Sequence, residues 1–245
     1  MTDTTRYARH LALPQFGAAG QARVAAGSVL VVGLGGLGSV ATQYLAAAGV
    51  GHLVINDFDR VDETNLPRQV LFTPADVGEF KTHATAARLK AANPDSRVSV
   101  LNRRLDAAEL ADAAGACDVV VDATDSFATR LAVNAACVAT RRPLVSGAAI
   151  RFQGQVAVFT APGGGGPCYR CLYAEDDENL AGCAGQGIFA PVAGTVGTVM
   201  AGEALKLLLG LDSGLRDRLW LHDGLAGGNR LLALRRSDGC PACGR

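Results

Sequence analysis

The chain has 245 residues and a mass of 25.2 kDa, enough for one large α/β domain or two small ones. Hydrophobic residues make up 49% and charged residues 19% of the sequence, a composition that excludes an intrinsically disordered protein. Lysine plus arginine and aspartate plus glutamate each number 23, so no overall charge attracts the chain to nucleic acid or to an anionic membrane.

The N-terminal segment combines helical patterning with the absence of a targeting signal. It has no basic region followed by an apolar one, and the chain has no uncharged apolar run near the roughly 20 residues that span a bilayer. We therefore expect a cytoplasmic protein that contacts no membrane. Apolar residues at helical spacing around Pro14 and Gly17 predict one or two helices over residues 6–26.

Strand and helix patterns alternate through the central part of the chain. The predicted strands cover residues 28–33, 53–57, 97–105, 118–125, 143–150 and 154–159. The predicted helices cover residues 39–50, 81–92 and the segment that joins the fourth strand to the fifth. This alternation predicts an α/β fold with a doubly wound, mostly parallel, Rossmann-like sheet.

The C-terminal part departs from this alternation. Two strand patterns, residues 218–224 and 231–236, follow each other without a crossover helix, which favours an antiparallel C-terminal extension. A helix over residues 195–210 has an apolar face for the core or for a subunit interface. We expect a single domain over residues 1–245, with N-terminal helices in 1–27, a nucleotide-binding core in 28–160 and a final part in 161–245.

A glycine-rich turn joins the first predicted strand to the first predicted core helix. Gly33, Gly35 and Gly38 form G-x-G-x-x-G, in which backbone amides can approach phosphate at a helix N-terminus. Asp57 ends the next strand about 20 residues further on, a position from which a carboxylate binds ribose. The motif predicts a nucleotide site; a tight turn without a ligand is the alternative. The same residues would serve NAD as well as ATP.

Cations and carboxylates beyond this motif favour ATP. Arg68 and Lys81 follow the second strand and can stabilise charge on phosphate oxygens, although both could also be solvated surface cations. Asp122 and Asp125 end the 118–125 strand, at the sheet edge where such folds bind ligands. Asp125 is the candidate Mg²⁺ ligand, with a helix N-cap as the alternative.

The seven cysteines include two C-x-x-C pairs. Four thiolates fit a tetrahedral structural zinc site that would tie the end of the chain to the loop after Gly166. A redox-active dithiol is the alternative. The four predicted zinc ligands are Cys168, Cys171, Cys240 and Cys243.

The other three cysteines have different settings. Cys183 lies in a glycine-flanked loop and is a candidate nucleophile, although no neighbouring base is visible. Cys117 and Cys137 lie in or beside apolar segments, which favours buried, inert thiols. The four histidines are scattered, so they suggest no catalytic metal site.

Several motifs occur together in one order along the chain. They are GLGGLG, NDFD, NLPRQ, the TD of DATDS, SGAAI and the two C-x-x-C pairs. In this combination, from Arg6 to Cys240 and its CPACG, the chain resembles the MoeB/ThiF/HesA family of E1-like sulfur-carrier-protein adenylyltransferases.

The resemblance implies that the C-terminal Gly-Gly carboxylate of a small ubiquitin-like sulfur-carrier protein attacks the α-phosphate of MgATP, giving acyl-adenylate and pyrophosphate. It implies a homodimer in which Arg9 reaches the ATP of the partner subunit. Relatives also carry a cysteine in the loop that holds Cys183, and the resemblance implies that this cysteine forms a covalent link in some of them and is dispensable in others. The residues that it assigns to ATP and Mg²⁺ are Gly36 and its neighbours, Asp57, Asn65, Arg68, Lys81 and Asp125.

The family comparison leaves some questions open. Relatives usually carry Asn where this chain has Ser126, so Ser126 is a candidate nucleotide contact through one hydrogen bond. The motifs do not separate a molybdopterin-type carrier from a thiamine-type carrier. With no room for a fused rhodanese domain, the sulfur donor is expected to be a separate protein. An NAD-dependent dehydrogenase and a non-catalytic nucleotide-binding scaffold are the alternative functions.

Overall fold

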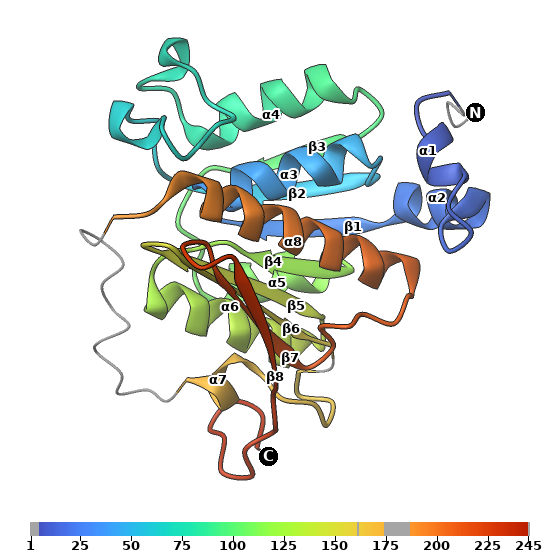
Figure 1. Cartoon of the computed structure of the whole chain (residues 1–245), viewed down its shortest axis with the longest axis vertical. Coiled ribbons are helices and arrows are strands. Elements are labelled where there is room, and N and C mark those ends of the chain that lie inside the picture. Colours follow the sequence, from blue (N-terminus) through green and yellow to red (C-terminus); the bar gives the residue numbers. More distant parts are fainter. Residues whose placement is uncertain (1–4, 161, 174–186, 245) are drawn as a thin grey trace.

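One mixed β-sheet organises the chain. The computed structural model describes residues 5–160, 162–173 and 187–244. Eight strands form a single sheet in the order β3-β2-β1-β4-β5-β6-β7-β8 (Figure 1). The first five pair in parallel and the last three extend the sheet in antiparallel fashion. The predicted α/β class, with a mostly parallel sheet and an antiparallel C-terminal extension, is confirmed.

The parallel half of the sheet is built from βα units. Its strands are β1 (Ser28–Val32), β2 (His52–Asn56), β3 (Arg97–Leu101), β4 (Val119–Asp122) and β5 (Leu144–Ile150). Its helices are α3 (Gly38–Ala47), α4 (Lys81–Ala92), α5 (Ala107–Gly115) and α6 (Phe127–Thr140). Because β1 lies between β2 and β4, the strand order reverses there, and ligands of such sheets bind at the carboxyl ends of the strands beside this point.

The antiparallel half contains β6 (Gln153–Phe159), β7 (Arg218–Asp223) and β8 (Gly228–Ala233). The prediction for β8, residues 231–236, was wrong in its bounds. The Asp223 carboxylate accepts hydrogen bonds from the backbone N–H groups of Leu225 and Ala226, and Gly227 adopts a positive φ of 72°. This tight turn starts strand pairing at Gly228, three residues earlier than predicted.

Two helical layers cover the sheet. Val29 and Val31 of β1 face the layer formed by α3 and α8 (Ala190–Leu209), whereas Leu30 and Val32 face α5 and α6. Helix α8 begins five residues earlier than predicted. It is the one helix in the described part of the chain long and apolar enough to cross a membrane, but it packs on α3, β4, β5 and β6 as a core helix.

The remaining elements are short or peripheral. Helices α1 (Ala8–Leu11) and α2 (Gly17–Ala26) precede β1 and therefore lie beside its amino end (Figure 1). Two 3₁₀ turns, η1 (Glu63–Asn65) and η2 (Pro74–Asp76), lie between β2 and α4. Helix α7 (Tyr169–Leu172) lies near the C-terminal segment, with which it forms the cysteine cluster described below.

Candidate active site and metal centre

A cavity of about 1020 Å³ lies where β1 and β4 end. It therefore occupies the place that the reversal of strand order predicts for a ligand. Its walls include the turn after β1, the segment between β2 and α4, the segment after β3, the loop after β4 with the start of α6, the end of β5, and the start of α8. The predicted site residues that line it are Gly33, Gly35, Gly36, Asp57, Asn65, Arg68, Lys81, Asp125 and Ser126.

The glycine-rich turn is closed so tightly that side chains are excluded at two positions. Gly33 has a φ of +87°, and a Cβ atom there would lie 2.9 Å from the carbonyl oxygen of Ala123. A Cβ atom on Gly38 would lie 1.9 Å from the carbonyl oxygen of Gly33. Gly38 is also the first residue of α3, so the turn delivers Gly35 and Gly36 to the cavity at a helix N-terminus.

Asp57 braces this turn from the end of β2. Its Oδ2 accepts a hydrogen bond of 2.7 Å from the Leu34 N–H, and its Oδ1 accepts one of 2.8 Å from the Asp59 N–H. Burial raises the pKa of Asp57, while Lys81 and the two N–H groups act in the opposite direction. The carboxylate thus has a structural role that the sequence did not predict, and its binding of ribose stays a prediction.

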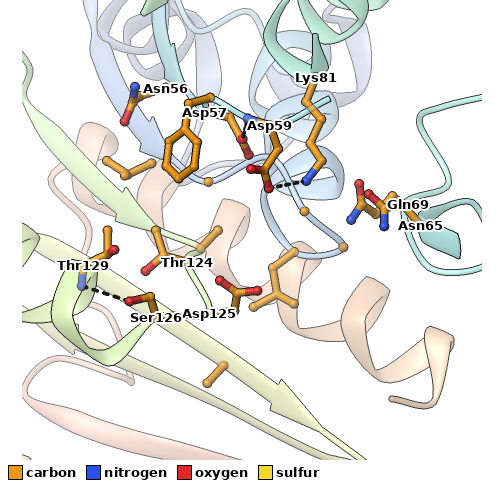
Figure 2. Close-up of a pocket in the computed structure, with 18 of the residues that line it drawn as sticks. Asn56, Asp57, Asp59, Asn65, Gln69, Lys81, Thr124, Asp125, Ser126 and Thr129 are labelled. Atoms are coloured by element: carbon orange, nitrogen blue, oxygen red, sulfur yellow. Dashed lines mark hydrogen bonds and ion pairs between the residues drawn. The ribbon is translucent and has the colours of Figure 1, made fainter. Parts of the chain in front are cut away.

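Lys81 reaches the cavity from the first residue of α4. Its side chain is 7% exposed, and its Nζ lies 3.0 Å from Oδ2 of Asp59, whose side chain is 55% exposed (Figure 2). Burial limits the conformations of the lysine, while the exposed partner leaves the ion pair open to exchange with a ligand. The Lys81 ammonium group is therefore already positioned at the cavity, and it can exchange its ion pair with Asp59 for one with a phosphate oxygen.

Arg68 and Asn65 lie on the segment around η1. The Arg68 Nη1 donates to the carbonyl oxygen of Thr64 at 3.0 Å, which fixes the side chain along the cavity wall. Gln69, beside Asn65 in Figure 2, also lines the cavity and is 3% exposed. No described residue donates a hydrogen bond to its buried Oε1, which identifies this oxygen as a further polar group available to a ligand. The prediction of site residues omitted Gln69.

The loop after β4 separates two carboxylates. Asp122 is fully buried and accepts hydrogen bonds from the N–H and Oγ1 of Thr124 and from Oγ of Ser146. Burial raises the pKa of Asp122, against the effects of Arg130 and these hydrogen bonds. Asp125, three residues later, is exposed and lines the cavity.

Ser126, not Asp125, caps helix α6. Its Oγ accepts a hydrogen bond of 3.5 Å from the Thr129 N–H (Figure 2). The alternative interpretation of Asp125 as an N-cap is therefore wrong. With the capping position taken by its neighbour, the Asp125 carboxylate remains available for a metal ion or a ligand.

Phe58, Arg104 and Arg130 also line the cavity and were not among the predicted site residues. The Arg104 guanidinium lies 4.4 Å from the ring centroid of Phe58, and both side chains line the cavity. Arg130, on the first turn of α6, donates two hydrogen bonds to the carbonyl oxygen of Thr124. Sequence spacing gave no signal for these residues, because the fold decides which side chains face the cavity.

The cavity balances charges of both signs. Its described lining includes five cationic residues, Arg60, Arg68, Lys81, Arg104 and Arg130. It also includes four carboxylates, Asp57, Asp59, Asp62 and Asp125. Neither histidine nor cysteine occurs among these lining residues, so the described wall has no imidazole or thiol for acid–base or covalent chemistry. The arrangement suits binding and orientation of a highly charged ligand together with a cation.

Two described residues of the predicted site, Gly38 and Arg9, are not among those that line this cavity. Arg9 is exposed on α1, beside the amino end of β1 and outside the cavity lining of its own chain. Cys183 lies outside the described residues. Neither the contribution of Arg9 to a partner subunit nor a covalent role of Cys183 is tested by this structure, and both stay predictions.

The two C-x-x-C pairs meet in space. The four Sγ atoms of Cys168, Cys171, Cys240 and Cys243 all lie within 4.8 Å of one another. Neighbouring sulfurs are 3.9, 3.7 and 3.4 Å apart. A tetrahedral site with Zn–S bonds of about 2.3 Å requires S–S separations of about 3.8 Å, which these distances bracket. The cluster can therefore hold a tetrahedral metal ion.

The chemistry of the cluster also suits a cation. Burial raises the pKa of the Cys168 thiol. Burial also acts to raise the pKa of Cys240, but hydrogen bonds from groups that include the backbone N–H groups of Cys243 and Ala242 outweigh it and lower this pKa to about 7. Four crowded sulfurs can ionise together only if a bound cation compensates their repulsion. Away from the cluster, burial raises the pKa of Cys117 to about 11 and also raises that of Cys137, as expected of inert thiols.

Comparisons with known proteins agree with this geometry. The ThiF family model matches residues 7–242. The sulfur carrier protein ThiS adenylyltransferase of Escherichia coli K12 is 45% identical over 242 residues, covering 99% of this chain and 96% of that protein. The molybdopterin-synthase adenylyltransferase of the same strain is 43% identical over 243 residues, covering 99% and 97%. The crystal structure of E. coli MccB with ATP matches with a TM-score of 0.87 at 26% identity, covering 99% of this chain and 75% of that one. The chain belongs to the ThiF family.

Proposed function

We propose that the chain is an adenylyltransferase that uses ATP to activate the C-terminal Gly-Gly carboxylate of a small ubiquitin-like sulfur-carrier protein. The observation that carries this proposal is the cavity at the strand-order reversal, where the glycine turn, Arg68, Lys81 and Asp125 face one space. The similarity to adenylyltransferases along 99% of the chain supports ATP over a nicotinamide dinucleotide. We therefore set the dehydrogenase alternative aside.

The reaction needs orientation and charge stabilisation more than proton transfer. A carboxylate oxygen of the carrier attacks the α-phosphorus of ATP, the bond from that phosphorus to the bridging oxygen breaks, and pyrophosphate leaves with the bonding electrons. An ionised carboxylate needs no general base, which fits the described lining without histidine or cysteine. Lys81 and Arg68 stabilise the charge that accumulates on the phosphate oxygens.

The remaining polar residues hold the nucleotide. Backbone amides of Gly35 and Gly36, at the start of α3, bind phosphate oxygens, and Asn65 and Ser126 add hydrogen bonds. Asp57 supports the turn and contacts ribose. When bound to the phosphates, Mg²⁺ neutralises part of their charge, and Asp125 is the residue placed to hold it.

The cysteine cluster serves as a structural zinc site in this proposal. All four ligand positions are cysteines, as in closed structural sites, and no exchangeable position for water is required. Cysteine pairs that bind a metal are typical of proteins in reducing compartments, so we place this protein in the cytoplasm as part of the proposal. A separate protein supplies the sulfur that the activated carrier accepts.

A homodimer would complete the site. Arg9 is exposed and at the opposite end of β1 from the cavity of its own chain, so its assigned contact with ATP requires a second subunit. Mixing Arg9→Ala subunits with Lys81→Ala subunits tests this arrangement. Partial recovery of activity in the mixture is expected if sites are completed between subunits, and no recovery would contradict it.

Carrier-dependent ATP–pyrophosphate exchange tests the proposed activity. The purified protein is assayed with a thiamine-type carrier, with a molybdopterin-type carrier and with each carrier lacking its Gly-Gly tail. Exchange that requires the intact tail supports the proposal, and the preferred carrier identifies the branch. The identities of 45% and 43% to relatives named for the two branches favour neither. Absence of exchange with both intact carriers would contradict the proposed substrate class.

A further inference from the structure

The corner that carries the first two cysteines is attached to helix α6 by a buried amide. Asn134, near the middle of α6, has no exposed surface. Its Oδ1 accepts a hydrogen bond of 2.8 Å from the Tyr169 N–H, and its Nδ2 donates to Sγ of Cys168 at 3.7 Å. Both polar ends of one side chain thus fix the point where Cys168 leads into α7. Burying an amide costs free energy unless its oxygen and its nitrogen both form hydrogen bonds, and both do so in Asn134.

A donor to a metal-bound thiolate matters for the metal itself. An N–H group that points at a ligand sulfur stabilises its negative charge and fixes its orientation, and loss of such an outer contact typically weakens metal binding by about 10- to 100-fold. Asn134 is the side chain that supplies this contact to Cys168 among the described residues.

The same helix also holds the loop of the nucleotide site. Arg130 precedes Asn134 by one helical turn, so the two side chains leave α6 on the same face. Its Nε and Nη2 donate to the carbonyl oxygen of Thr124 at 3.0 and 2.6 Å, directly before Asp125. Arg130 also interacts with the buried phenol of Tyr169, next to Cys168.

Ring contacts reinforce this connection. The ring of Phe127, the first residue of α6, lies 6.2 Å from that of Tyr169 and 6.4 Å from that of Tyr173. The Tyr173 hydroxyl accepts a hydrogen bond of 2.6 Å from Gln155 Nε2 on β6. Helix α7 is therefore clamped between the start of α6 and the antiparallel half of the sheet.

We propose that Asn134 is a positioning residue: it fixes the Cys168 sulfur and the start of α7 on α6, and through α6 it couples the four-cysteine metal site to the loop that carries Asp125. The nucleotide half of this inference rests on the proposed function. The metal half does not, because it concerns only zinc retention.

Zinc release tests the metal half. Zinc transfer from the loaded protein to a colorimetric chelator is followed for the wild type, Asn134→Ala and Asn93→Ala. Asn93 is the matched control, because it is also fully buried and donates two hydrogen bonds, but to Tyr7 and Ala46. We expect release from Asn134→Ala to be about tenfold faster or more, and release from Asn93→Ala to be unchanged. Equal rates for the two variants would overturn the role of Asn134.

A second variant separates the sulfur contact from general loosening. Asn134→Asp keeps an acceptor for the Tyr169 N–H but places a carboxylate oxygen against the Cys168 sulfur. We expect zinc release at least as fast as in Asn134→Ala. Retention restored to the wild-type rate in Asn134→Asp would show that the N–H contact to sulfur does not hold the metal.

The Mg²⁺ dependence of ATP binding tests the nucleotide half. Binding is measured by calorimetry at saturating zinc, so that metal loss does not contribute. Asn134→Ala is expected to require on the order of threefold more Mg²⁺ for half-maximal binding, and Asn93→Ala to match the wild type. Identical Mg²⁺ dependence in Asn134→Ala and wild type would refute the coupling. A wild type that binds no ATP would instead refute the proposed function, and the zinc assay would still decide the metal half.

Discussion

The loop after β4 and the cysteine cluster both contain ionisable side chains, but the two regions differ in how far these side chains are exposed. Asp125 is exposed to the cavity and is not the cap of its helix, whereas three of the four clustered cysteines are buried. The loop keeps a charge available for a ligand, and the cluster uses its groups to bind one another or a metal. The comparison teaches that what holds a polar group matters: the Asp125 carboxylate faces the cavity, whereas the cysteine sulfurs lie against one another.

The largest expected effect comes from removing a phosphate-facing cation. Lys81→Ala and Arg68→Ala should each lower carrier-dependent pyrophosphate exchange by about 10²- to 10³-fold, because charge in the transition state is left unstabilised. Stability should change by about 1 kcal/mol or less in Lys81→Ala, since its partner Asp59 is 55% exposed. Urea unfolding checks the fold. Full exchange in either variant would remove that residue from the catalytic set.

Removal of the exposed carboxylate should give the next largest loss of activity. Asp125→Asn keeps the size of the side chain but weakens a metal ligand, so we expect exchange to need roughly tenfold more Mg²⁺. A Mg²⁺ titration of exchange measures this shift. The neighbouring variant Thr129→Ser keeps the α6 backbone contact with Ser126 and serves as the control. An unchanged Mg²⁺ requirement would exclude Asp125 as a ligand.

Loss of the metal from the cysteine cluster should lower the thermal stability of the protein more than its catalytic activity. Cys243→Ser, or treatment with a strong chelator, should lower the melting temperature by on the order of 10 °C, a loss of about 3 to 5 kcal/mol in a protein of this size. Cys117→Ser is the control, because Cys117 is buried outside the cluster. Equal melting temperatures with and without chelator would contradict a structural metal site.

The smallest expected effect concerns the cap of α6. Ser126→Ala should cost about 0.5 to 1 kcal/mol, because its Oγ accepts a long hydrogen bond of 3.5 Å from Thr129. Ser126→Asn should keep that stability, since asparagine is an equally good cap. Thermal unfolding compares the two variants. A larger loss in Ser126→Asn than in Ser126→Ala would show that the loop cannot accept an asparagine at this position.

The sequence predicted best what local patterns control. Helix α4 has the predicted bounds, Lys81–Ala92, and the C-x-x-C spacing led to the cluster although its halves are 72 positions apart. Gln69 and Arg130 escaped prediction because their roles depend on which side chains face the cavity, which spacing alone does not determine. The bracing role of Asp57 is likewise visible only in its hydrogen bonds to Leu34 and Asp59.

Ligand binding by calorimetry tests the central claim most directly, because it asks what the cavity at the carboxyl ends of β1 and β4 holds. The wild type and Lys81→Ala are titrated with MgATP and, separately, with NAD. We predict that the wild type binds MgATP, that Lys81→Ala binds it at least tenfold more weakly, and that neither binds NAD tightly. Tight NAD binding without a response to MgATP would contradict the assignment of this cavity to ATP.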